Sequence, residues 1–147
     1  MANRVKYYRD FREHLTALEE RGKLVRIQRE INKDTELMPL VRWQFRGLDE
    51  RERKAFMFER IIDSKGKRYS MPVTVGTLAA TTEIYAIGMM CEPEQIAERW
   101  NQAQLNPFDP IKVTSAPVHE VVWQGQDILN GHGLDMIPVP ISTPGFD

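Results

Sequence analysis

The clearest pattern of apolar and polar positions lies between Asp10 and Gly22. Its apolar residues recur at i, i+4 and i+7, so they share one stripe of a helix: Phe11, Leu15 and Leu18. Asp10 can cap the first turn, and Glu13 three residues later completes a capping-box-like pair. Gly22 can end the helix in a left-handed conformation. The sequence therefore predicts a helix between these two residues.

A second helical pattern begins near Asp34, with Glu36 in its first turn, where a carboxylate interacts favourably with the helix dipole. Pro39 bends this helix unless it falls within the first turn. The predicted buried face consists of Leu37, Val41, Phe45 and Leu48. Two shorter helices are predicted further on, one capped by Thr81 or Thr82 and one that begins at Pro93.

Short runs of branched and aromatic residues alternate with these helices. They are "KLVRI" (23–27), "AFMFERII" (55–62) and "MPVTVG" (71–76), and each is typical of a strand. After Pro110, residues 111–128 contain similar short runs, but no further helical period follows. We therefore predict an α+β fold, with a helix-and-strand domain over 1–110 and the first strands of a second, β-rich domain over 111–147.

Composition narrows the function classes. The formal net charge of the 147-residue chain is −1, and its basic residues are interspersed with acidic ones, so nothing indicates nucleic-acid binding. No stretch approaches the ~20 apolar residues of a membrane span, and the first ten residues lack the apolar middle of a secretion signal. Cys91 is the only cysteine, which fits a reducing compartment. We expect a cytoplasmic protein that does not bind membranes.

The sequence shows no recognisable active site. His14, His119 and His132 are far apart and have no second ligand at helical or hairpin spacing, so a metal site is not predicted. "GTLAATTE" (76–83) follows a strand and opens a helix, which allows either a helix cap or an anion site. Trp43, Trp100 and Trp123 are predicted to be core residues. No catalytic, cofactor-binding or metal-binding residue is assigned.

The order of these motifs resembles the UbiD family of reversible decarboxylases. "YYRDFREHLTALEERGKLVRI" resembles the family's opening helix and strand, and "AFMFERI" is similar to its "PALLFENV" strand. "MPVTVGTLAATTEIYAIGM" resembles a later family segment. "APVHEVVWQGQDI" and "GLDMIPVPISTPGFD" are similar to the family's passage into a flavin-binding domain with a split β-barrel fold.

The resemblance implies a cofactor and a reaction. Family members use prenylated FMN, with a divalent metal such as manganese on the flavin phosphate, to add or remove CO₂ on aromatic or α,β-unsaturated carboxylic acids. The family's metal ligands and its glutamate–arginine–glutamate network lie downstream of the position that matches Asp147. The resemblance therefore implies that this segment alone is inactive and binds neither flavin nor metal.

Two functional interpretations follow from the resemblance. The chain can be the structural N-terminal portion of a UbiD-like carboxy-lyase, packed against the remainder of the enzyme. Alternatively, it is a non-catalytic subunit or binding module that assembles with a separate catalytic chain. Homo-oligomers are expected in either case, because family members often form dimers or hexamers and unpaired strand edges favour association.

Overall fold

In the computed structural model, which describes residues 7–142, a four-stranded mixed sheet forms around β2 (Ala55–Ile62). β1 (Leu24–Asn32) runs parallel to β2, while β3 (Arg68–Tyr69) and β4 (Val73–Val75) pair with β2 in the antiparallel sense. The central position of β2 explains its nearly continuous apolar sequence, because both of its edges and parts of both faces are covered. The predicted α+β class is confirmed.

α1 (Phe11–Glu20) has the ends that its sequence predicts. The Asp10 carboxylate accepts hydrogen bonds from the amides of Arg12 and Glu13 at 2.8 and 3.0 Å. The Glu13 side chain reaches back to the amide of Arg9 rather than to that of Asp10, so the reciprocal part of the capping box is displaced by one residue. Gly22 has a φ of 66°, which is the predicted left-handed end.

α2 (Leu37–Gly47) connects the parallel strands β1 and β2, as a parallel pair requires. Pro39 lies in the first turn of α2, where backbone N–H groups have no hydrogen-bond partner within the helix, so the missing N–H of proline breaks no helical bond. The conditional prediction of a bend therefore does not apply. A short 3₁₀ turn, η1 (Glu50–Glu52), leads from α2 to β2.

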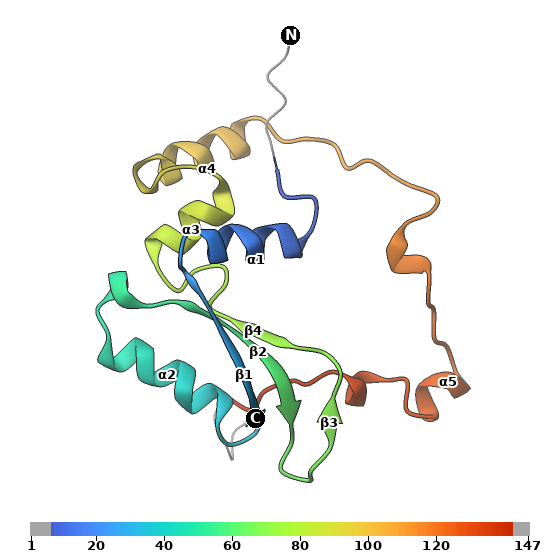
Figure 1. Cartoon of the computed structure of the whole chain (residues 1–147). Coiled ribbons are helices and arrows are strands. Elements are labelled where there is room, and N and C mark those ends of the chain that lie inside the picture. Colours follow the sequence, from blue (N-terminus) through green and yellow to red (C-terminus); the bar gives the residue numbers. More distant parts are fainter. Residues whose placement is uncertain (1–6, 143–147) are drawn as a thin grey trace.

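Three helical elements follow the sheet. α3 (Thr82–Met89) is capped by the Thr81 hydroxyl, which accepts from the amide of Ile84. A 3₁₀ turn, η2 (Pro93–Gln95), then leads into α4 (Ile96–Leu105). Figure 1 shows α1, α3 and α4 gathered at one end of the sheet, with α2 beside β1 at the other end. The predicted helix that begins at Pro93 is thus confirmed, as two consecutive elements.

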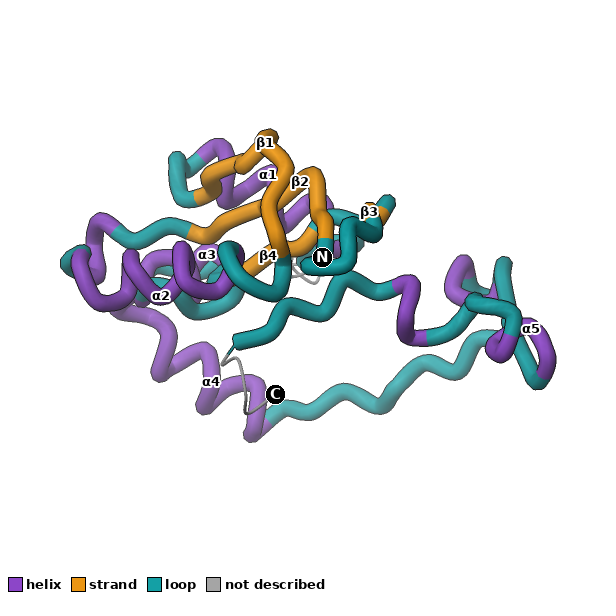
Figure 2. The backbone as a smooth tube through the Cα atoms, turned by 90° about the horizontal axis from the view of Figure 1, so that it is seen from below, coloured by secondary structure: helices purple, strands orange, loops and turns teal. Residues whose placement is uncertain are grey.

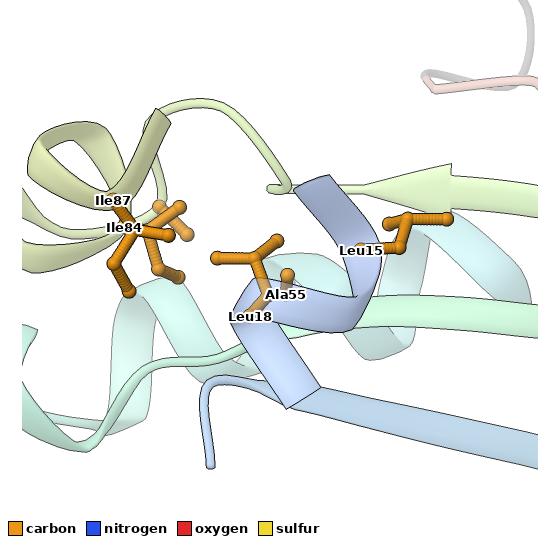
Figure 3. Close-up of a cluster of buried hydrophobic side chains, with 6 residues drawn as sticks. Leu15, Leu18, Ala55, Ile84 and Ile87 are labelled. Atoms are coloured by element: carbon orange, nitrogen blue, oxygen red, sulfur yellow. The ribbon is translucent and has the colours of Figure 1, made fainter. Parts of the chain in front are cut away.

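Two apolar clusters make the core. The first joins α1 and α3 to the start of β2 and contains Leu15, Leu18, Ala55, Ala80, Ile84 and Ile87. In Figure 3, Leu18 projects from α1 between Ala55 and the Ile84–Ile87 pair of α3. The second lies under α2 and contains Ile31, Leu37, Val41, Phe58 and Ile61. Each fully buried aliphatic side chain contributes roughly 1.5–3 kcal/mol.

Residues 107–133 leave this body as an arm, which Figures 1 and 2 show reaching away from the sheet towards α5 and then turning back. The arm contains the 3₁₀ turn η3 (Pro117–His119) and α5 (Gln126–Leu129), and η4 (Leu134–Met136) follows it. The prediction of strands after Pro110 is wrong for residues 111–142, where none occurs. The physical reason is that this segment has no strand to pair with. Among the described residues, no neighbouring strand runs beside it to share backbone hydrogen bonds.

The returning segment is tied to the lower end of the sheet. Lys67 Nζ donates to the carbonyl oxygen of Asp135 at 2.5 Å, and the amide of Ile141 donates to the carbonyl of Lys33 at 3.3 Å. Arg42 of α2 donates to the carbonyl of Ser142. The motif "TPGFD", which resembles the threshold of a flavin-binding domain, lies outside the described residues.

Among the residues that the structure describes, no helix combines the length and the apolar composition needed to cross a bilayer.

Candidate functional site

The N-terminus of α3 is the place where the sequence allows an anion to bind. In the structure this position holds a carboxylate of the chain itself. Glu50 Oε1 accepts hydrogen bonds from the Thr82 amide at 2.7 Å and from the Thr82 hydroxyl at 2.6 Å. These two bonds lower the pKa of Glu50. The segment is therefore a helix cap whose anion is a carboxylate of the chain itself. The sequence alone does not indicate that Glu50 supplies this carboxylate, because only the tertiary fold brings it to Thr82.

His14 is buried in the core between α1 and α3. Its Nε2 lies 2.8 Å from the carbonyl oxygen of Thr77, and a carbonyl can only accept, so Nε2 carries the proton. Nδ1 is buried and has no hydrogen-bond partner among the described residues. Tyr8 lies against the imidazole with a ring-centroid distance of 5.2 Å, and its own hydroxyl donates to the carbonyl of Ile87. These contacts make His14 a packed core residue.

The other two histidines lie in the arm. His132 stacks on Trp123 with ring centroids 4.9 Å apart, whereas His119 ends the short turn η3. Neither lies beside His14. Within residues 7–142, no group of three or more His, Cys, Asp or Glu side chains is arranged to hold a metal ion.

The tryptophans do not occupy the core, so that prediction is wrong. Trp43 is 77% exposed, Trp100 47% and Trp123 45%. Trp43 lies on α2 and Trp100 on α4, and both faces leave the indole exposed, whereas Trp123 lies in the arm and stacks on His132. The sequence alone does not show whether a helix face that carries a tryptophan is covered in the folded protein.

An apolar concavity lies between the N-terminal segment, the end of α3 and α4. We call it the α3–α4 groove; its volume is about 600 Å³ and its lining includes Tyr7, Tyr8, Met89, Met90, Trp100 and Ala103. Met90 ends α3 with a φ of 52°, the one positive φ among the described non-glycine residues. Trp100 is held in place by a 2.6 Å hydrogen bond from its Nε1 to the Tyr85 hydroxyl.

Arg99 adds a cation to one side of this groove. It is half-buried, and its Nη2 donates to the carbonyl of Met90 at a long distance of 3.4 Å. Arg99 also lines a polar cavity of about 300 Å³ with Cys91, Gln95 and Glu98. The sequence indicates no role for Arg99, because nothing in its local pattern distinguishes it from other helix-surface arginines.

Comparison with known proteins identifies the fold. A family model for the 3-octaprenyl-4-hydroxybenzoate carboxy-lyase N-terminal domain of UbiD proteins matches residues 15–104. The structure of the UbiD-class enzyme HmfF from Pelotomaculum thermopropionicum, in complex with FMN, is similar to this chain with a TM-score of 0.69 and 30% identity. An evolved dimeric form of HmfF in complex with prFMN gives a TM-score of 0.70 at the same identity.

The matches cover most of this chain but only a small part of the HmfF chains. The two HmfF structures match 90% of this chain, whereas the chain covers only 26% and 28% of theirs. The vanillic acid decarboxylase of Sedimentibacter hydroxybenzoicus, in its open form, shares the fold over 68% of this chain with a TM-score of 0.51 and 21% identity. The chain thus spans about a quarter of the length of the HmfF structures that it matches. On the family match and these structures, the chain belongs to the UbiD family, of which it contains the N-terminal domain.

Proposed function

We propose that this chain is the structural N-terminal portion of a UbiD-like decarboxylase that acts reversibly on an aromatic or α,β-unsaturated carboxylic acid with prenylated FMN. The observation that carries the proposal is the combination of a family match over residues 15–104 with coverage of about a quarter of HmfF. HmfF is a UbiD-class enzyme seen with FMN and with prFMN. An enzyme as long as HmfF would have most of its residues outside the part that this chain matches.

Two helix N-termini that could receive a flavin phosphate are already engaged by carboxylates of this chain. The amides at the start of α3 are engaged by Glu50, and those at the start of α1 are engaged by Asp10. No metal-binding group of side chains occurs in residues 7–142. These observations support a structural role, and no catalytic, cofactor-binding or metal-binding residue of this chain is proposed.

The arm supports a role that depends on further polypeptide. Its apolar side chains are open to solvent, and several of the largest are more than half exposed: Phe108, Ile111, Val118, Val121 and Leu129. A free protein rarely leaves so many apolar side chains together on its surface. Additional chain, either the remainder of one enzyme or a separate catalytic subunit, would bury them.

A non-catalytic subunit is the second candidate, because the unequal coverage is equally compatible with a separate catalytic chain. One experiment tests both. The protein is purified under native conditions from its own cells by an antibody against residues 7–106, and its intact mass and associated chains are determined by mass spectrometry. A polypeptide about three to four times longer, at the 26–28% coverage seen with HmfF, supports the first candidate. A 17.1 kDa chain with a UbiD-family partner supports the second, and a 17.1 kDa chain without one contradicts both.

A further inference from the structure

α4 buries none of its ten residues. An isolated helix of this length is marginal in water, and helices in proteins owe most of their stability to packing of an apolar face. The apolar face of α4, with Trp100 and Ala103, lines the α3–α4 groove instead of being covered. The side chain that would complete the packing of α4 is therefore not supplied by residues 7–142.

Arg99 has an incomplete set of partners at the same place. A guanidinium has five N–H donors, and among the described residues Arg99 makes one long hydrogen bond, to the carbonyl of Met90. Within the described residues, no carboxylate lies within ion-pair distance of Arg99, whereas Arg26, for example, is paired with Glu19 and Glu59. A half-buried arginine beside an apolar groove suits a bidentate contact with a carboxylate.

We propose that the α3–α4 groove is the docking surface for a segment of the UbiD-like protein that lies outside this chain, and that this segment places an apolar side chain over Trp100 and a carboxylate on Arg99. This inference rests on the proposed function. Two observations favour this occupant. About three quarters of an HmfF-sized protein lies outside the region that the chain matches. The groove also presents one cation, Arg99, that has no acidic partner among the described residues.

The test is site-specific photo-crosslinking in cells that make the native protein. A photoreactive phenylalanine analogue replaces Ala103, which lines the groove, and in a matched control it replaces Gln104, the next residue of α4, which does not. We expect position 103 to give a crosslinked peptide from the UbiD-family sequence outside residues 1–147, with an Asp or Glu near the site of attachment. Position 104 is expected not to give this peptide.

Charge reversal tests the role of Arg99. Arg99→Glu is expected to abolish the crosslink from position 103, and the milder Arg99→Gln to reduce it, whereas Arg46→Glu on the exposed surface of α2 should leave it unchanged. Circular dichroism of each variant checks that the fold is retained. A crosslink that persists in both Arg99 variants would overturn the proposed ion pair.

The outcomes separate this inference from the proposed function. If the remainder of a UbiD-family enzyme is present but position 103 crosslinks to a second copy of residues 1–147, or to nothing, the docking site is wrong and the proposed function stands. If no UbiD-family sequence beyond this chain is found in the cells, the proposed function fails and the inference fails with it.

Discussion

Gln44 illustrates how one side chain can complete a fold at the residue scale. It is buried on α2, where its Nε2 donates to the carbonyl of Lys54 at 2.6 Å and its Oε1 accepts from the amide of the same residue at 2.9 Å. Lys54 precedes β2, so these bonds satisfy the backbone where the central strand begins. A buried backbone group without a partner is costly.

We expect Gln44→Leu to lower the free energy of unfolding by about 1–3 kcal/mol, since it leaves the amide and the carbonyl of Lys54 unpaired. Urea unfolding followed by circular dichroism measures the change. Gln102→Leu is the control, because Gln102 lies on the surface of α4 and bonds only to the neighbouring turn. Equal losses in the two variants would show that the contact with Lys54 is not responsible.

The hydrogen bonds to Glu50 should make the stability of the fold depend on pH. Its hydrogen bonds from Thr82 lower its pKa below the ordinary value, so the stability that it contributes is present above that value and is lost as the pH falls through the lowered pKa. Wild type should therefore be more stable than Glu50→Gln at pH 7, and the difference should shrink in the acid range below the ordinary value of 4.5. Glu52→Gln serves as the control. A difference that does not change with pH would exclude this role for Glu50.

At the scale of whole elements, the unit formed by α1, Gly22 and β1 is the best determined by its sequence. Asp10 fixes the start of the helix, Gly22 its end, and the amide of Lys23 bonds back to the carbonyl of Leu18. All of these contacts join residues less than six apart. Such local contacts do not depend on distant parts of the chain, and they agree with the position at which the chain turns into the sheet.

Two glycines form a matched pair for this element. A Cβ at Gly22 or at Gly47 would meet nothing within 4 Å, but only Gly22 has a positive φ. We therefore expect Gly22→Ala to destabilise the fold by roughly 1–2 kcal/mol, and Gly47→Ala, at the end of α2, to be neutral or stabilising by up to about 1 kcal/mol. Thermal unfolding of both variants measures these changes in stability. A neutral Gly22→Ala would refute the requirement for a left-handed residue.

The limits of sequence reasoning follow the same division between local and distant contacts. The caps at Asp10 and Thr81 were predictable, because each is settled within three residues. The pairing of Glu50 with Thr82, 32 residues away, was not, because it depends on how η1 meets α3. The strands expected over 111–128 fail for a related reason: apolar alternation indicates a strand only where a neighbouring strand is available.

At the scale of the molecule, we propose a domain boundary near residue 110, where the body ends and the arm begins. Lys112 is the only lysine or arginine in residues 107–142, and it is exposed. Trypsin should therefore cut first after Lys112, because proteases act on exposed, extended segments before packed ones. Mass spectrometry of a time course identifies the first product. Lys112→Gln should delay the first cleavage, whereas earlier cleavage within residues 11–105 would contradict the boundary.

The central claim is that this chain contributes scaffold, and that the flavin chemistry of the family requires residues outside it. The most direct measurement is the visible absorbance spectrum of the purified 147-residue chain after incubation with prenylated FMN and Mn²⁺ and exhaustive dialysis. The account predicts no flavin band in the protein fraction. A retained flavin band at close to one flavin per chain would contradict it.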